Sequence, residues 1–235
     1  MNLIFDFDQT LGYRDGMWSS VIFEILQESG YSNVEYNSIR LYTKIGFPWN
    51  DYHVSHNKLF NGLSWWEYME VIVTRVLLNF GINDNEAKVL SKKVRNKYLD
   101  LSKWHLFDET YDVLESLTSL DYNCYILSNH VPELSAITNH LGIDKFIKKI
   151  FNSADIGYEK PNSKIYQYVI KDLNVPLESI IMVGDNYIAD VVGARSNGIN
   201  AVFVRAENKF DYKFYCKDLL SLKNVIEKIR FSVNF

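Results

Sequence analysis

The chain has 235 residues, of which 47% are hydrophobic and 15% aromatic, so it is long enough to bury a sizeable core and too apolar to be disordered. Its formal net charge is −4 and it has no block of lysine and arginine, which argues against nucleic acid and anionic membranes as partners. We expect no secretion signal, because the first apolar stretch is short and acids interrupt it, and no membrane span, because no apolar run approaches the roughly 18–20 residues that cross a bilayer. Because Cys124 and Cys216 have no metal-site spacing, we expect a soluble, cytoplasmic protein in a reducing compartment.

A buried strand is predicted over residues 2–5, and it ends abruptly in two acids, Asp6 and Asp8. Side chains alternate along an extended chain, so these two carboxylates lie on the same side, about 7 Å apart. Two like charges in this position favour a cation between them, and Mg²⁺ prefers carboxylate oxygens together with water and a substrate phosphate. Thr10 follows with a hydroxyl that can bind a phosphate oxygen. On these residues alone, solvated acids in a loop are an equally good interpretation.

Residues 16–99 show helical periodicity and no strand pattern. Helices are predicted over residues 16–30, 37–45, 64–80 and 85–98. Ser64 followed by Glu67 is typical of a capping box at the start of the third of these helices. We therefore expect an all-helical unit inserted after the first strand. Its tryptophans, among them Trp18, Trp65 and Trp66, are expected mainly to pack within the unit, with substrate contact as the alternative.

From about residue 100 onward, helices and strands alternate. Helices are predicted over residues 108–120, 132–141, 161–173, 188–197 and 219–230, strands over 122–127, 179–183 and 201–204, and an extended segment over 150–156. Such alternation predicts a parallel sheet with helices on both faces. The fold class is therefore α/β, a doubly wound parallel sheet formed by residues 1–15 and 100–235, with residues 16–99 inserted as a helical domain.

Polar residues gather where three of the predicted strands end. They are Asp6, Asp8 and Thr10 after the first strand, Ser128 and Asn129 after the second, and Gly184, Asp185 and Asn186 after the third. Ligands of open parallel sheets bind at the carboxyl ends of the strands. Each cluster alone fits an ordinary turn, but three clusters on one edge favour a site. Lys160, just before a helix that Pro161 would start, is a candidate counter-charge, and Asp190 follows five positions after Asp185.

In this order and spacing, the residues resemble the four motifs of the haloacid dehalogenase (HAD) superfamily of aspartyl phosphohydrolases. The motifs are Asp6-x-Asp8-x-Thr10, Ser128-Asn129, Lys160-Pro161 and Gly184-Asp185-x4-Asp190. The resemblance covers the predicted sheet and implies a Rossmann-like HAD core. The helical insertion resembles the first cap class of the superfamily, which implies that substrate recognition lies there.

The resemblance also implies a role for each motif residue. Asp6 would be the nucleophile that forms an aspartyl-phosphate, and Asp8 the general acid and then the general base. Mg²⁺ would be held by Asp6, the backbone carbonyl of Asp8 and Asp185, with Asn186 and Asp190 in support. The phosphoryl oxygens would be bound by Thr10, Ser128, the Asn129 backbone amide and Lys160. Lys160 is also expected to pair with Asp190 or Asp6.

Three positions refine this expectation. Asp8 disfavours carbon–halogen cleavage, because the dehalogenases of the superfamily lack this second acid. Gln9 replaces the glycine that most members carry, and glycine adopts positive φ more freely than glutamine. His130, directly after Ser128 and Asn129, is either a substrate contact or a surface residue.

Together these features predict a Mg²⁺-dependent phosphatase for a small phosphorylated metabolite, such as phosphoglycolate, a nucleotide or a sugar phosphate. A sugar-phosphate mutase that uses the same aspartyl-phosphate is the main alternative. A phosphonate hydrolase would require a Schiff-base lysine in the cap, for which Lys44 and Lys58 are the first candidates. A signalling receiver is disfavoured by the large insertion, and a non-catalytic interaction protein by the intact acids and lysine. The composition is compatible with a monomer or a homodimer.

Overall fold

The computed structural model of the chain describes residues 1–233, so residues 234 and 235 of the predicted core lie outside the described part. The chain forms two compact units. We call the first, Met1–Tyr13 with His105–Phe235, the sheet unit, and the second, Arg14–Trp104, the helical unit.

The sheet unit is organised around a six-stranded sheet in the order β5-β4-β1-β6-β7-β8. The strands are β1 (Asn2–Phe5), β4 (Asn123–Ser128), β5 (Ile147–Asn152), β6 (Ile180–Gly184), β7 (Asn200–Val204) and β8 (Tyr215–Cys216). All neighbouring strands pair in parallel, and Phe5 of β1 lies opposite Ile126 of β4 and Val183 of β6. β1 is therefore the central strand between β4 and β6, and the predicted α/β fold class is confirmed.

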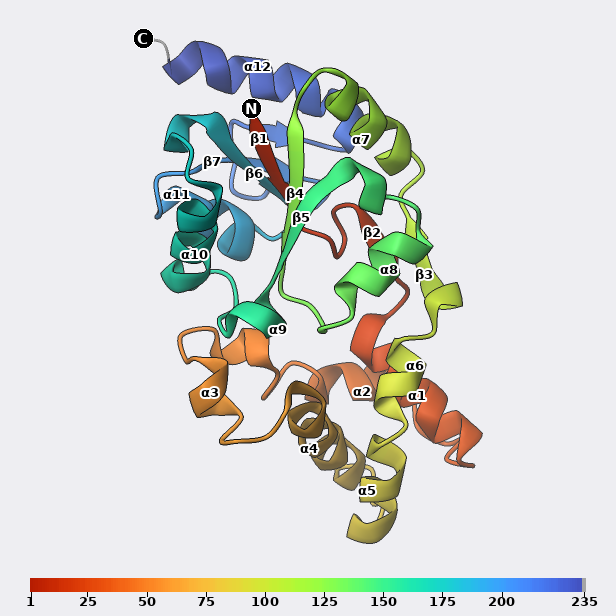
Figure 1. Cartoon of the computed structure of the whole chain (residues 1–235). Helices are drawn as coiled ribbons and strands as arrows, with labels where there is room; N and C mark the ends of the chain where they lie inside the picture. The colour runs from red at the N-terminus through yellow and green to blue at the C-terminus, as the bar shows by residue number, and fades with distance from the viewer. Residues whose placement is uncertain (234–235) are drawn as a thin grey trace. The chain divides into compact units, whose positions relative to one another are not determined.

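Helices cover both faces of this sheet (Figure 1). α7 (Thr110–Ser119) and α8 (Leu134–His140) lie on one side, and α10 (Ser163–Leu173) and α11 (Gly193–Arg195) lie on the other. This is the arrangement that right-handed crossovers produce when the chain moves outward from β1 to β5 and then returns to β6 and β7. α9 (Ser153–Ile156) and α12 (Leu222–Val233) complete the unit. Because both faces are covered, the β1 side chains Leu3, Ile4 and Phe5 are fully buried.

Local details of the sheet unit differ from the sequence-based expectations. The helix predicted over residues 161–173 begins at Ser163, because the Asn162 side chain accepts a hydrogen bond from the Lys164 amide and caps it. The extended segment predicted over 150–156 ends at Asn152, whose side chain caps α9 in the same way. The helix predicted over 188–197 is a π-helical turn, Tyr187–Val192, followed by α11.

The helical unit contains six α-helices among its described residues. They are α1 (Met17–Glu28), α2 (Tyr36–Tyr42), α3 (His56–Leu59), α4 (Trp65–Leu78), α5 (Asp84–Ser91) and α6 (Val94–Tyr98). The predicted capping box is confirmed, since the Ser64 amide donates to Glu67 and the Glu67 amide donates to the Ser64 hydroxyl. One helix was expected over residues 85–98, but a tightened turn with a hydrogen bond from Lys93 to the Leu90 carbonyl divides it into α5 and α6. β2 (Gly12–Arg14) and β3 (Trp104–Leu106) form a separate two-stranded sheet.

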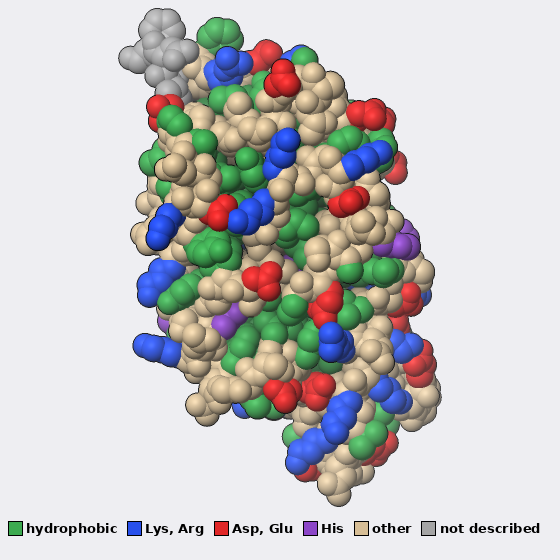
Figure 2. All heavy atoms as spheres, in the orientation of Figure 1, with side chains coloured by type: hydrophobic (Ala, Val, Ile, Leu, Met, Phe, Trp, Pro, Cys, Tyr) green, Lys and Arg blue, Asp and Glu red, His purple; other side chains and the backbone are tan. Residues whose placement is uncertain are grey.

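The aromatic residues of the helical unit pack against one another. Trp18 stacks on Tyr98 with ring centroids 4.2 Å apart and also contacts Trp65 and Trp66, all of them buried. The packing role expected for these tryptophans therefore accounts for their contacts. No helix among residues 1–233 is long and apolar enough to cross a membrane. On the face drawn in Figure 2, basic and acidic side chains are interspersed.

Candidate active site

The carboxyl ends of three adjacent strands bring the predicted site residues together. Asp6 directly follows β1, and its amide continues the pairing with β6 by donating to the Val183 carbonyl at 2.9 Å. Ser128 is the last residue of β4, and Asp185 follows the last residue of β6. Since β1 lies between β4 and β6, the three polar clusters meet at one edge of the sheet.

Lys160 is the cation of this cluster. Its ammonium lies 2.8 Å from Asp6 Oδ1 and 2.6 Å from Asp190 Oδ1, and all three residues are buried. Burial alone would lower the pKa of Lys160, but the carboxylates of Asp190 and Asp6 outweigh it, so the pKa is raised. Lys160 is therefore a fixed positive charge that pairs with both acids named in the sequence-based expectation.

Asp185 and Thr10 are joined by two hydrogen bonds. The Thr10 hydroxyl accepts from the Asp185 amide at 3.1 Å and donates to Asp185 Oδ1 at 3.3 Å. Thr10 is fully buried, and these two hydrogen bonds join the first motif to the last. Asn186 plays a different part, because its side chain accepts from the amides of Ile188 and Ala189 and caps the π-helical turn.

Asn129 fixes the backbone around Lys160. Its side-chain oxygen accepts from the Lys160 amide at 2.7 Å, and its side-chain nitrogen donates to the Lys160 carbonyl at 2.9 Å. The Asn129 side chain is thus occupied in placing the lysine. The Ser128 hydroxyl is buried and has no hydrogen-bond partner among the described residues, so it can accept or donate to a ligand.

Asp8 and its neighbours form the edge of the cluster. Its side chain is 21% exposed, and its Oδ1 lies 3.7 Å from His130 Nε2. His130 is 2% exposed and packs edge-on against Phe7, so the surface interpretation of this histidine is wrong. Gln9 adopts φ 59°, the left-handed conformation in which glycine is usual, and its amide donates to the Gly12 carbonyl at 2.8 Å.

The acids of the cluster carry more negative charge than Lys160 offsets. Burial, followed by the charges of Asp6 and Asp190, raises the pKa of Asp185 to about 8. Burial raises the pKa of Asp190 to about 6, despite the attraction of Lys160. Burial, with Asp6 and Asp185, raises the pKa of Asp8 well above its ordinary value. Burial and the neighbouring carboxylates thus disfavour the charged form of all three acids, a cost that a bound cation would relieve.

The geometry of the acids fits a divalent cation. Asp6, Asp185 and Asp190 each offer a carboxylate oxygen, and these oxygens lie within 4.8 Å of one another. Carboxylate oxygens are hard ligands of the type that Mg²⁺ selects. The donor set and its excess negative charge are therefore suited to Mg²⁺. Two of these acids, Asp6 and Asp185, are also the side chains that the sequence indicated as metal ligands.

Gly184 is required by the close approach of Asp190. A β-carbon at position 184 would lie 2.2 Å from Asp190 Oδ2 and 2.3 Å from its Cγ. We expect Gly184→Ala to displace this carboxylate and lower the free energy of unfolding by about 1–3 kcal/mol, measured by urea denaturation. Two of the three close contacts disappear when Asp190 is replaced by alanine, so the same change should be smaller in an Asp190→Ala background. An equal loss in both backgrounds would contradict this account.

One residue that contacts the site was not indicated by the sequence. Arg205, directly after β7, donates from Nε to the Thr10 carbonyl at 2.9 Å. The two residues are 195 positions apart, and a single arginine after a strand carries no periodic signal. The pairing of β1 with β6 and of β6 with β7 brings Arg205 near the first motif.

Comparisons with known proteins find related sequences and structures. The family model of the haloacid dehalogenase-like hydrolases matches residues 3–204. Pyrimidine 5'-nucleotidase PynA of Streptococcus pneumoniae is 23% identical over 250 residues, covering 97% of this chain and 98% of that protein. 5-Amino-6-(5-phospho-D-ribitylamino)uracil phosphatase YigB of Escherichia coli is 26% identical, covering 64% of this chain and 61% of that protein.

A solved structure shows the same fold. The HAD-hydrolase YfnB of Bacillus subtilis, in a form bound to magnesium, matches with a TM-score of 0.75 and 21% sequence identity. The match covers 96% of this chain and 98% of that one. The architecture is therefore shared over almost the whole length of both chains.

Proposed function

Because the chain belongs to the haloacid dehalogenase-like hydrolase family, we propose that it is a Mg²⁺-dependent phosphatase that acts through an aspartyl-phosphate on Asp6. Its substrate is a small phosphorylated metabolite. The observation that carries this proposal is the placement of Asp6 beside Lys160, Asp185 and Asp190, with Asp8 two positions further along the chain. A nucleophilic carboxylate, a second carboxyl group and a set of metal ligands are thereby available at one strand edge.

Mg²⁺ would be held by Asp6, Asp185 and the backbone carbonyl of Asp8, with Asp190 and Asn186 in support. When bound, it offsets the charge that otherwise opposes the approach of a carboxylate to an anionic phosphoryl group. Lys160 supplies a second positive charge, and its contact with Asp6 keeps that carboxylate in place.

The reaction divides into two displacements at phosphorus. In the first, an Asp6 oxygen attacks phosphorus, the ester P–O bond breaks, and the carboxyl of Asp8 gives its proton to the leaving oxygen. The raised pKa of Asp8 supports this role, because burial, with the charges of Asp6 and Asp185, favours its protonated form. In the second, the Asp8 carboxylate takes a proton from water, water oxygen attacks phosphorus, and the bond to Asp6 breaks with release of phosphate.

The phosphoryl oxygens would be bound by groups at the same edge. The Ser128 hydroxyl is buried and has no hydrogen-bond partner among residues 1–233, which supports its assignment to a phosphoryl oxygen. The Asn129 side chain is engaged with the Lys160 backbone, so its backbone amide is the group assigned to this task. The ammonium of Lys160 completes the set, where charge accumulates in the transition state. The Thr10 hydroxyl, which the sequence assigned to this task, donates its proton to Asp185 instead.

Phosphate release from a panel of compounds tests the proposal. PynA and YigB are both named for substrates that contain a pyrimidine ring, so pyrimidine 5'-mononucleotides come first in the panel. Glyceraldehyde 3-phosphate, phosphoglycolate, a sugar phosphate and an aryl phosphate follow, each with and without Mg²⁺. We expect Mg²⁺-dependent release from at least one of them. No release by folded protein, together with a bisphosphate-activated isomerase activity, would support a mutase instead.

Asp8→Ala should lower phosphate release about 10²-fold or more, because the leaving oxygen then departs without its proton donor. The loss should be smaller for the aryl phosphate, whose leaving group is stable as an anion. Initial rates with the best metabolite substrate of the panel and with the aryl phosphate measure both effects. Wild-type rates in the variant would exclude Asp8 as the general acid.

Asp185→Asn should weaken the dependence of stability on both Mg²⁺ and pH. In chelator, the wild-type pKa of about 8 means that folding favours the protonated acid, so Asp185 stabilises the protein at low pH and this stabilisation is lost as pH rises through about 8. Mg²⁺ at about 100 times its Kd should restore about 2.7 kcal/mol at alkaline pH. The variant should show a flatter pH profile and little Mg²⁺ effect by thermal denaturation. A wild-type-like Mg²⁺ effect in the variant would contradict the assignment of Asp185.

A further inference from the structure

Arg205 is held in one orientation by three groups of the sheet unit. Its guanidinium lies 2.8 Å from Glu109 Oε1 and 3.6 Å from the ring centroid of Phe107, while Nε donates to the Thr10 carbonyl at 2.9 Å. Its side chain is only 14% exposed. A planar guanidinium can hold an ion pair, an aromatic contact and a directed hydrogen bond at once, which an ammonium cannot.

The backbone of Arg205 is itself in an unusual conformation. Its φ is 61°, which lies in the left-handed region that residues other than glycine, asparagine and aspartate rarely adopt. Such conformations persist only where the surrounding contacts stabilise them, and they cluster at functional sites. Here the unusual conformation occurs in the residue that donates a hydrogen bond to Thr10, the last residue of the first motif.

Thr10 connects Arg205 to the proposed metal ligands. Arg205 holds the carbonyl of Thr10, and the hydroxyl of the same residue makes both hydrogen bonds to Asp185. The next residue, Leu11, is also fixed, because its carbonyl accepts from the Thr110 hydroxyl at 2.8 Å. The turn after Asp8 is thus held by hydrogen bonds to Arg205, Thr110 and Asp185.

We propose that Arg205 is a positioning residue for the metal site, which acts by fixing Thr10 and through it the orientation of the Asp185 carboxylate. This inference rests on the proposed function. The side chain of Arg205 contacts Thr10, Glu109 and Phe107 and not the carboxylates of Asp6, Asp185 and Asp190, so its effect is on the placement of a ligand. Groups that orient metal ligands typically change metal affinity or activity by about 10- to 100-fold when they are replaced.

Arg205→Gly is the variant that tests this role, because glycine accepts φ 61° without strain while the guanidinium is lost. The Kd of Mg²⁺ is measured by titration calorimetry and by the Mg²⁺-dependent shift in melting temperature, neither of which requires turnover. We expect Kd to rise about 10- to 100-fold. Arg205→Lys keeps the charge but not the planar set of N–H donors. We therefore expect its log Kd for Mg²⁺ to lie closer to that of Arg205→Gly than to that of the wild type.

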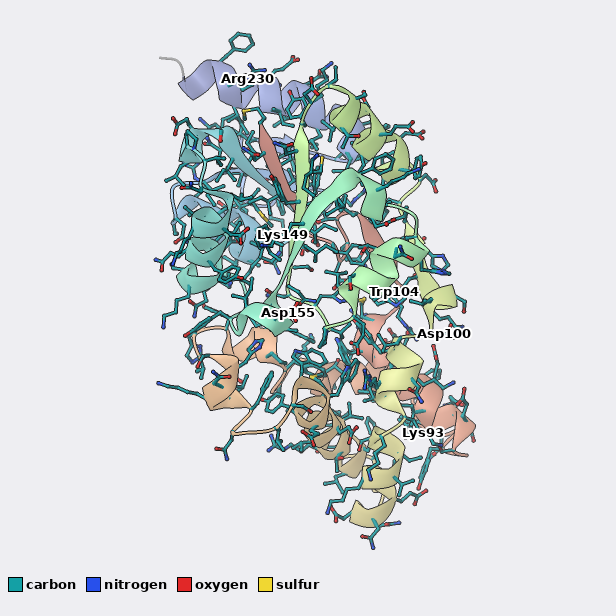
Figure 3. The ribbon with its side chains drawn as sticks, in the orientation of Figure 1. Lys93, Asp100, Trp104, Lys149, Asp155 and Arg230 are labelled. Carbon is teal, nitrogen blue, oxygen red and sulfur yellow. The ribbon has the colours of Figure 1, made fainter. Side chains whose placement is uncertain are left out.

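A matched control is Lys149→Met on β5 (Figure 3). Lys149 also makes an ion pair, 2.6 Å to Asp172, and also lies over an aromatic ring, that of Phe151, but it has no contact with the first motif. Its loss should leave the Kd of Mg²⁺ unchanged. A purely structural role of Arg205 would lower the melting temperature in chelator without changing Kd.

The outcomes separate this inference from the proposed function. If folded Arg205→Gly binds Mg²⁺ as tightly as the wild type, the positioning role is wrong and the metal site stands. If the wild type itself shows no Mg²⁺ binding and no Mg²⁺-dependent phosphate release, the proposed function fails, and the role of Arg205 fails with it.

Discussion

Asp6→Asn is expected to reduce phosphate release by about 10⁴-fold or more, the scale seen when a covalent nucleophile is removed. Asparagine has almost the shape of aspartate, but its neutral amide does not attack phosphorus. The ammonium of Lys160 keeps its contact with Asp190, so the variant should remain folded. The loss should therefore appear in the chemical step and not in the melting temperature.

Trapping of the covalent intermediate measures this directly. Rapid acid quench with a phosphate-labelled substrate should give labelled wild-type protein whose label is released by hydroxylamine, as expected for an acyl phosphate. Asp6→Asn should give none. Asp155→Asn is a suitable control, because Asp155 is an exposed aspartate on α9 of the same unit (Figure 3) and should leave labelling unchanged. Labelling of Asp6→Asn at the wild-type level would place the nucleophile at another residue.

The central strands could be predicted because each is a short apolar run that ends abruptly in polar residues, as β1 does at Asp6 and β6 does at Asp185. The shorter strands could not. β2 and β3 have three residues each and β8 has two, too few for side-chain alternation to be recognised. These strands form only because their partners are already in place.

The π-helical turn shows where local sequence is insufficient. Residues 188–197 have an ordinary helical pattern, yet the Asp190 carboxylate accepts from the Asn186 amide at 3.0 Å and also pairs with Lys160. A distant lysine therefore helps to fix the position of Asp190, and the sequence cannot show this. π-Helical turns of this kind are frequent at functional sites.

The same reasoning separates the site residues that could be predicted from those that could not. Asp6, Ser128 and Asp185 follow predicted strands, and parallel strands place such residues on one edge. Arg205 and the buried His130 depend on contacts between segments far apart in the chain. His130 lies against Phe7 because β1 and β4 are neighbours, and Arg205 reaches Thr10 because β6 and β7 are.

Lys160→Met should have the largest effect on stability. Methionine fills a similar volume but leaves Asp6 and Asp190 facing each other without the ammonium that lies 2.8 Å and 2.6 Å from them. Removal of one partner from a buried ion pair lowers the free energy of unfolding by about 3–5 kcal/mol. We expect a loss of this size in chelator, measured by urea denaturation, and a loss of phosphate release of about 10²-fold or more because a charge near the phosphoryl group is gone. Lys164→Met, at an exposed position of α10, is the control and should change neither quantity.

Two further measurements test whether charge is the cause of this loss. Asp190→Asn in the Lys160→Met background removes one of the two carboxylates that then repel each other, so the double variant should be more stable than the single one. If the two substitutions acted independently, the double variant would be the less stable. Mg²⁺ should also stabilise Lys160→Met by more than it stabilises the wild type, because the cation then supplies the positive charge that Lys160 no longer places beside Asp6. If the single and double variants are equally unstable and Mg²⁺ has the same effect on both as on the wild type, the loss reflects packing of the lysine chain, and the ammonium is not what holds these carboxylates together.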